Sequence, residues 1–390
     1  MNLCMPYLSV YMLALGLSDT RIGFIVTVNL LMQMVFSFFS GPITDKMGRR
    51  KATVIFDALA WSIPSLIWWH AEGFWFFLIA AVINGSNSVT ANSWNCLLIE
   101  DVKKRHITRI YSLAIACGQL HAVFAPITAI LFSRLTLVPA IRILFINAFI
   151  LMTLKVIILY LASKETETGK MRIIETKGKN VFQLAGGYGE VIKLILNSRG
   201  MVFSIVIAAL GWIVLTINNT FWHIIVNKKL LVPEATLPLF NVFRAALAII
   251  FLFFVIPKLL KGILKIPLVF AFASYFAGQF LLIMIPVEGA LKYPLILVSL
   301  VFDGFGLGAI TMLCESLIAI HVNPNERARI MALRYMIIMI ATAPFGWIGG
   351  ILSDISRNLP FVLNMAVLVI GIALTLVYYR KENDHSAEHT

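Results

Sequence analysis

The sequence has few charged residues. Asp, Glu, Lys and Arg make up 13% of its 390 residues, whereas hydrophobic residues make up 60%. In an average soluble domain about a quarter of the residues are charged, and a chain this apolar could not bury its hydrophobic surface in one core. The composition therefore excludes an ordinary soluble protein and indicates that lipid forms part of the solvent.

Patterns for catalysis and metal binding are also missing. The four cysteines lie in apolar segments without CxxC or Cys/His spacing, so we expect no disulfide framework, no metal and no cofactor. We find no HExxH, no GxSxG and no phosphate-binding loop, which argues against a membrane enzyme. No ATP-binding motif is present either.

Long apolar runs recur instead, each near the ~20 residues that cross a hydrocarbon core. Their length predicts membrane helices rather than barrel strands, which would be about half as long. The expected spans are residues 1–17, 22–40, 52–69, 74–98, 107–133, 139–162, 201–226, 236–257, 266–286, 291–319, 330–352 and 359–379. We therefore expect an all-α integral membrane protein with twelve transmembrane helices. The first span lacks signal-peptide features and is short, so we expect a truncated first helix.

The longest polar segment, residues 163–200, separates six expected helices from six others. It predicts an N-terminal bundle (1–162), a cytoplasmic linker (163–200) ending in a surface helix near Glu190 to Leu196, and a C-terminal bundle (201–390) with a short cytoplasmic tail. Dipeptides that match at nearly constant spacing indicate duplicated halves. Asn84-Gly85 matches Asp303-Gly304, Leu98-Ile99 matches Leu317-Ile318, and Ala125-Pro126 matches Ala343-Pro344.

The net charge of +13 lies mainly at the ends of the expected spans. This distribution argues against a nucleic-acid partner. With a cytoplasmic N-terminus, about two thirds of the Lys and Arg residues fall in inside loops. We therefore expect a multi-pass protein of the cell membrane with both termini cytoplasmic. Lys155, within a span, is expected to extend its amine toward the inner surface.

The hairpin between the second and third spans reads GPITDKMGRRK. It resembles the signature loop of the major facilitator superfamily, in which a Gly, an Asp four residues later and a Gly-Arg-Arg/Lys cluster occupy this cytoplasmic hairpin. Physically, Gly41 would permit close helix approach, Gly48 would permit a tight turn, and Arg49 needs an acidic partner at the end of the fourth span. The candidate gating-loop residues are Gly41, Asp45, Gly48, Arg49, Arg50, Glu100 and Asp101.

The resemblance implies two six-helix bundles, transport of a small molecule by alternating access and a functional monomer. In the family the loop Asp meets the start of helix 11, which here contains Arg327, Arg329 and Arg334. The loop of the second half, Lys258 to Lys265, has no Asp, so one such latch is expected. The sugar-porter sequence after helix 6 is missing, and the antiporter Gly-Pro motif of helix 5 survives only as Ala125-Pro126. These features favour efflux of amphipathic compounds over uptake of a nutrient (sugar, amino acid or organic acid), with a non-transporting receptor as a third reading. Asp303 and His121 favour protons as the coupling ion.

Polar residues inside the spans are candidates for the transport pathway. A stripe on the fourth span should face a wet cavity or, alternatively, form hydrogen bonds between helices. Arg244 and Asp303 lie at similar depth and are expected to pair, with Asp303 binding a proton or a polar solute, and His121 titrates in the range of a proton relay. The candidate pathway residues are Asn84, Asn87, Asn92, Asn95, His121, Asn218, Asn219, Arg244 and Asp303.

Overall fold

The computed structural model describes residues 1–102, 106, 110, 113–114, 117–118, 121–184, 188–251, 264–321 and 327–387. Every regular element within these ranges is a helix. Nine of the helices are long and apolar enough to cross a membrane. They are Asp19–Met47, Arg49–Trp69, Phe74–Ile99, Leu137–Ala162, Arg199–Lys229, Lys265–Met284, Lys292–Cys314, Leu333–Ile355 and Leu359–Arg380. The predicted fold class, an all-α integral membrane protein, is confirmed.

Shorter helices occupy the remaining three expected positions. Met5–Ala14 stands at the first, Phe124–Arg134 at the fifth, and Leu237–Ile250 at the eighth. Much of the expected fifth span and the end of the eighth fall outside the described residues. Next to the first helix, the Ser65 hydroxyl of the third crossing lies 3.4 Å from the Met1 sulfur.

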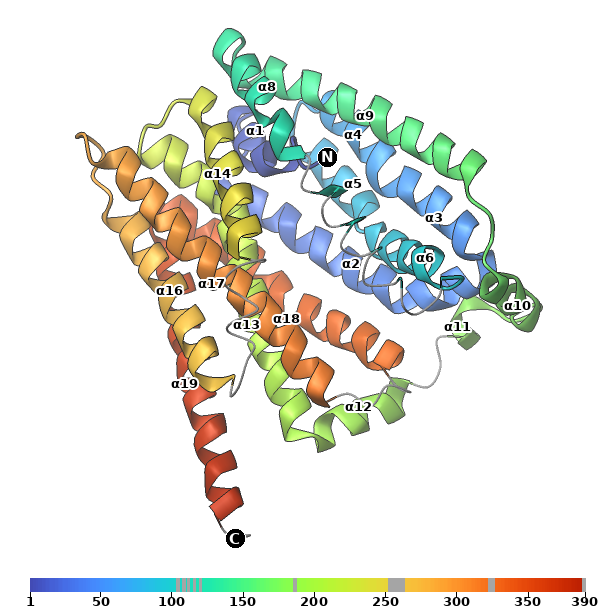
Figure 1. Cartoon of the computed structure of the whole chain (residues 1–390). Coiled ribbons are helices and arrows are strands. Elements are labelled where there is room, and N and C mark those ends of the chain that lie inside the picture. The colour runs from blue at the N-terminus through green and yellow to red at the C-terminus, as the bar shows by residue number, and fades with distance from the viewer. Residues whose placement is uncertain are drawn as a thin grey trace.

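The labels of Figure 1 follow the chain. The first half contains η1 (Met5–Tyr7), α1 (Leu8–Ala14), α2 (Asp19–Met47), α3 (Arg49–Asp57), η2 (Ala58–Ser62), α4 (Ile63–Trp69), α5 (Phe74–Asn84), α6 (Asn87–Ile99), α8 (His121–Arg134) and α9 (Leu137–Ala162). The connecting segment contains α10 (Glu167–Glu175), α11 (Val181–Leu184) and α12 (Tyr188–Asn197). The second half contains α13 (Arg199–Ile224), η3 (Ile225–Lys229), η4 (Glu234–Thr236), α14 (Leu237–Ile250), α16 (Lys265–Met284), α17 (Lys292–His321), α18 (Arg327–Ile355) and α19 (Leu359–Ala387).

Local chemistry sets the ends of α2. The Ser18 hydroxyl accepts a hydrogen bond from the Arg21 N–H at 3.3 Å and caps the start of the helix. Gly48 ends it with a φ of +85°, a conformation that side chains with a Cβ rarely adopt. We call the end of the bundle that carries Gly48 and helices α10–α12 the linker end, and the opposite end, which carries Ser18, the far end.

The two halves meet along α2 and α18. In Figure 1 the blue-to-green helices of the first half and the yellow-to-red helices of the second lie on opposite sides of this contact. Glycines bring the two backbones together, since a Cβ on Gly350 would come within 2.9 Å of the Thr20 Cα, and a Cβ on Gly23 would collide with the Gly346 carbonyl. The halves are therefore in intimate contact near the far end.

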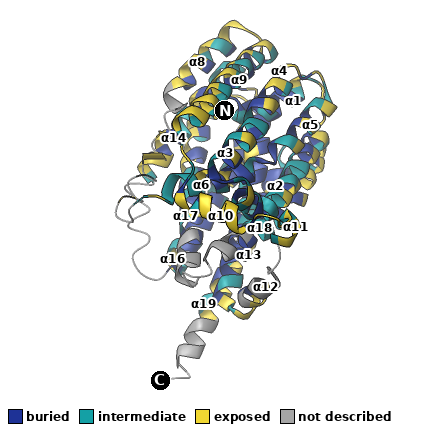
Figure 2. Cartoon of the chain, turned by 90° about the vertical axis from the view of Figure 1, so that its right-hand side faces the viewer, coloured by how far each residue is buried: buried dark blue, intermediate teal, exposed yellow. Residues whose placement is uncertain are grey.

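Apolar side chains also cover the outside of the bundle. On α9, one face exposes Ile150, Leu151, Leu154, Ile158 and Leu161, each at least 49% accessible. Figure 2 shows buried residues turned toward the middle of the bundle and exposed ones along its outer faces. Such a continuous apolar surface is rare on a soluble monomer and suits contact with lipid tails.

Candidate functional site

Arg49 ties three helices together at the linker end. Its guanidinium lies 2.8 Å from the Asp45 carboxylate of α2 and 3.0 Å from both carboxylate oxygens of Glu100, just beyond α6. The Arg49 side chain is only 6% exposed, so this is a mostly desolvated charge cluster. Asp101, the other candidate partner, instead accepts the Glu167 N–H at 3.3 Å.

Glu165, which the sequence did not single out, covers the start of α3. Its carboxylate accepts the N–H groups of Arg49 at 2.8 Å and Arg50 at 3.0 Å, where unpaired donors and the helix dipole favour a negative charge. Thr166 adds a 2.6 Å hydrogen bond to Glu100. The connecting segment is thus bonded to the signature loop. No local sequence pattern could predict this contact, because Glu165 lies 116 positions from Arg49 in the chain.

Two further expectations for the signature loop concerned Gly41 and Asp45. A Cβ on Gly41 would have nothing within 4 Å, so the predicted close helix approach at Gly41 is wrong. The close approaches fall elsewhere on α2, at Gly23 and opposite Gly85. The predicted latch from Asp45 to the start of α18 rests largely on Arg327 and Arg329, whose side chains lie outside the described residues.

The asparagines of the fourth crossing do not act as one stripe, because the helix is interrupted at Gly85 and Ser86 between α5 and α6. Asn84 is buried, donates to the Ala60 carbonyl at 2.7 Å and accepts from Asn29 at 3.1 Å. This is the interhelical bonding left open as the alternative reading. Beyond the interruption, Asn92 donates to Thr44 at 3.3 Å, Asn95 bonds its own helix, and Asn87 lines a pocket.

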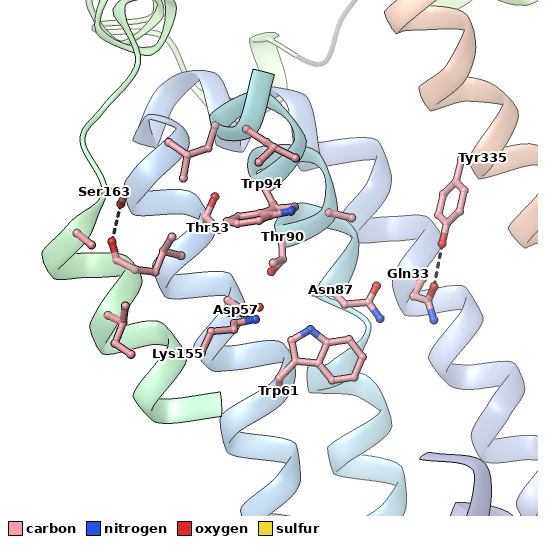
Figure 3. Close-up of a pocket in the computed structure, with 16 residues that line it drawn as sticks. Gln33, Thr53, Asp57, Trp61, Asn87, Thr90, Trp94, Lys155, Ser163 and Tyr335 are labelled. Atoms are coloured by element: carbon pink, nitrogen blue, oxygen red, sulfur yellow. Dashed lines mark hydrogen bonds and ion pairs between the residues drawn. The ribbon is translucent and has the colours of Figure 1, made fainter. Parts of the chain in front are cut away.

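That pocket, about 890 Å³ in volume, lies among α3, η2, α6 and α9 (Figure 3). On its wall the Lys155 amine lies 2.5 Å from the carboxylate of Asp57, whose side chain is 3% exposed. The expectation that the Lys155 amine extends toward the inner surface is therefore wrong, since the amine of this half-exposed side chain pairs with a buried carboxylate instead. The pocket belongs to the first half, apart from its rim, where Tyr335 of α18 donates to Gln33 at 3.0 Å.

A second cavity, of about 560 Å³, lies between the halves, and we call it the interhalf cavity. Its polar lining comes mainly from α13 and α14, opposite residues of η1, α1 and α2. The lining residues are Asn2, Met5, Pro6, Leu8, Ser9, Met12, Val26, Asn219, Thr220, His223, Asn241, Arg244, Ala245 and Ala248. Asn241 donates to the Tyr7 hydroxyl at 2.7 Å and so connects the halves beside the cavity.

Arg244 and Asp303 do not form the expected ion pair. The Arg244 guanidinium carbon lies 3.9 Å from the centre of the Trp222 ring, a cation–π contact. Asp303 accepts instead from the Gln279 amide at 2.9 and 3.0 Å. A similar depth along two spans does not determine which neighbouring helix each side chain faces.

A buried amide network surrounds Asp303. Gln279 also donates weakly to Asn218 at 3.4 Å and accepts from Asn364 at 3.1 Å, so α13, α16, α17 and α19 share one cluster of hydrogen bonds. Asn218 therefore belongs to this network, whereas Asn219 lines the interhalf cavity. The side chain of His121 lies outside the described residues.

Polar contacts close the far end, and we call this group of Asp19, Thr20, Ser353, Asp354 and Arg357 the far-end seal. The Asp354 carboxylate accepts from the backbone N–H groups of Asp19 at 3.0 Å and Thr20 at 2.9 Å, and from the Thr20 hydroxyl at 2.5 Å. The Asp19 carboxylate, fully buried, contacts both Ser353 and Arg357. The seal thus joins the start of α2 to the end of α18.

The seal was missed from the sequence, although a signal exists. Gly350, Asp354 and Arg357 repeat most of the spacing of Gly41, Asp45 and Arg49, but at the opposite end of the bundle. Deeper along the same contact, the Thr27 hydroxyl donates to the Ala343 carbonyl at 2.6 Å and accepts from the Trp347 N–H at 2.9 Å.

Solved structures share this architecture. A nucleoside transporter, NupG, superimposes with a TM-score of 0.71 over 97% of this chain and 95% of its own, at 12% sequence identity. The xylose transporter XylE from E. coli, in a partially occluded inward open conformation, gives a TM-score of 0.68 over 97% and 94% of the two chains, at 16% identity. At such identities the likeness concerns the fold.

Curated relatives match shorter segments. An uncharacterized MFS-type transporter of Bacillus subtilis, YqjV, is 24% identical over 133 residues, which cover 34% of this chain and 32% of the relative. The quinolone resistance protein NorA of Staphylococcus aureus is 29% identical over 105 residues, 27% of either chain. The chain thus spans about a third or less of the length of these relatives. The sequence profile of the Major Facilitator Superfamily, however, matches residues 1–289, and the chain belongs to that superfamily.

Proposed function

We propose that the protein is a secondary active transporter that moves a small solute by alternating access through the interhalf cavity. The observation that carries this proposal is the position of the cavity. It is lined by both halves and lies beneath a set of contacts that joins α2 to α18. A cavity placed between two bodies changes its access when those bodies rock against each other.

The bundles proposed to move are residues 1–162 and 201–390, linked by residues 163–200. The proposed location is the plasma membrane, with the linker end and both termini in the cytoplasm, and the excess of basic residues in the loops on that side supports this orientation. With that orientation the far-end seal lies on the outer side, and in this conformation it closes the interhalf cavity to the outside. Opening outward would require the Asp354 contacts to Asp19 and Thr20 to separate.

Among substrates, we favour export of amphipathic compounds. The interhalf cavity combines Met, Pro, Leu, Val and Ala side chains with a few polar groups, a lining that suits a partly apolar solute. The segment similar to a quinolone resistance protein points the same way. Uptake of a nutrient is the second candidate, favoured by the likeness of fold to nucleoside and xylose transporters. A receptor that binds without transport is the third, and we propose a monomer as the working unit in each case.

Protons are the proposed coupling ion, and Asp303 is the proposed proton site. Its buried carboxylate accepts hydrogen bonds from the Gln279 amide instead of forming a direct salt bridge, so a proton could bind it without first breaking an ion pair. The proposal is tested with purified protein in proteoliposomes, by recording solute-induced pH changes across a panel of cationic drugs, sugars and amino acids.

Asp303→Asn is the variant for this test, since it keeps the size of the side chain and one acceptor oxygen for Gln279 but removes the charge and the proton-binding group. We expect one class of compound to move protons with the unaltered protein and to move none with Asp303→Asn. Glu288→Gln, a matched change in an exposed far-end loop, should leave the signal unchanged. Labelled solute that crosses without any pH change would contradict proton coupling, and proton movement that survives Asp303→Asn would contradict the assignment of the site.

A further inference from the structure

We propose that Arg244 is the anchor for the solute in the interhalf cavity and that the solute it selects carries a carboxylate. The inference rests on the proposed function and adds the chemical class of the substrate. It starts from an arginine that lines a cavity between the halves and that forms no salt bridge with Asp303, the carboxylate expected to pair with it.

The Arg244 guanidinium is held in place by Trp222, but one of its nitrogens lacks a hydrogen-bond acceptor among the described residues. Trp222 supports one face of the guanidinium at 3.9 Å, which fixes its plane. Its Nη2 atom is buried and has no hydrogen-bond partner within the part of the chain that the structure describes. A buried guanidinium N–H group without an acceptor is costly, and a cation–π contact replaces only part of the lost hydration. A bound anion would supply the missing acceptors.

The charge balance around the cavity favours an anion with one negative charge. Among the described lining residues, Arg244 alone has a fixed charge, and none is Asp or Glu. Asp303 lies behind the cavity, engaged with Gln279, and offsets part of the positive potential. A single, partly offset cation suits a monocarboxylate better than a doubly charged phosphate ester. A planar guanidinium also matches the geometry of a carboxylate.

Other lining groups extend the site. His223 is 2% exposed and lies edge-on to the rings of Tyr7 and Trp222, with ring centres 5.5 and 5.0 Å apart. Asn219 presents a further amide to the same space. Opposite them, Met5, Leu8 and other apolar residues of the first helix would contact the rest of the solute. The site therefore suits a small amphipathic acid, with its carboxylate toward α14 and its apolar part toward α1.

Three compounds of similar shape test the inference: 4-phenylbutyrate, 4-phenylbutyramide and 4-phenylbutylamine. Binding is measured by calorimetry on the protein in lipid nanodiscs, with no need for transport. We expect the acid to bind at least about tenfold more tightly than the amide, and the amine to bind most weakly. Arg244→Gln should remove the preference for the acid, whereas Arg244→Lys should keep part of it. Arg21→Gln, at an exposed arginine near the far end, is the control.

Equal binding of the acid and the amide by the unaltered protein, or binding of none of the three, would overturn the inference whatever the variants do. A preference that persists in a folded Arg244→Gln protein would overturn it as well. Flux in proteoliposomes separates this outcome from failure of the proposed function. An acid that binds through Arg244 but never crosses would contradict transport alone, and flux that is indifferent to both the carboxylate and Arg244 would contradict the anchor alone.

Discussion

Replacing Arg49 by glutamine is expected to lower the free energy of unfolding by about 3 kcal/mol, the lower part of the range for breaking a buried ion pair. The variant would leave the carboxylates of Asp45 and Glu100 close together without the cation between them. Glu100 is only 16% exposed, so water would compensate it poorly. The midpoint of thermal unfolding in detergent, followed by tryptophan fluorescence, should fall by several degrees.

Two matched variants give this experiment its controls. Arg49→Lys keeps the charge but has no planar fork with which to reach both carboxylates. Its unfolding midpoint should therefore lie between those of the unaltered protein and of Arg49→Gln. Lys51→Gln removes an exposed charge from the same helix and should change little, because isolated surface charges contribute little to stability. If Arg49→Gln unfolds at the same temperature as Lys51→Gln, the charge cluster does not stabilise the linker end.

The second large effect is expected at the far-end seal. Asp19→Asn removes the charged acceptor that meets Arg357 and Ser353, while the backbone contacts to Asp354 remain. Loss of a charge-assisted hydrogen bond costs about 1.5–3 kcal/mol, which corresponds to a roughly ten- to hundredfold rise in the population open at the far end. The open population rises because the Asp19 contacts stabilise only the closed state, in which α2 and α18 lie together.

Spin labels report this population directly. One label replaces Glu72 in the first half and the other replaces Ser356 in the second, both exposed at the far end, in a protein without its native cysteines. Asp19→Asn should add or enlarge a population with a longer label separation. Glu288→Gln, an exposed carboxylate of the neighbouring loop, should not. An unchanged distance distribution in Asp19→Asn would show that the seal does not control closure.

The crossings and the family were predictable because each rests on a local signal. A membrane helix is recognised from consecutive apolar residues, and the turn at Gly48 follows from a motif of eleven residues, Gly41 to Lys51. The connecting segment also contains a helix, α12, over the residues expected to form one. Hydropathy could not place the interruption at Gly85, because an interrupted helix can have the same composition as an unbroken one.

The pairing of polar groups was less predictable. Lys155 forms an ion pair with Asp57, and Asp303 accepts a hydrogen bond from Gln279. Both contacts join two helices and depend on the rotation of each helix about its axis. A single sequence fixes the depth of a residue to within about a turn but leaves this rotation open. Arg244 was correctly marked as unusual within a span, yet its stacking on Trp222 needed the packed structure.

Alternating access is the central claim, and a reversible lock on the far end tests it most directly. Thr20→Cys and Asp354→Cys are introduced together into a protein without its native cysteines, at two side chains that contact each other across the seal. Transport of the solute found in the proteoliposome screen is measured after oxidation and again after dithiothreitol. Transport that stops on oxidation and returns on reduction is the predicted result. Transport at the full rate by protein shown to be crosslinked would contradict the account, since the solute would then cross without the far end opening.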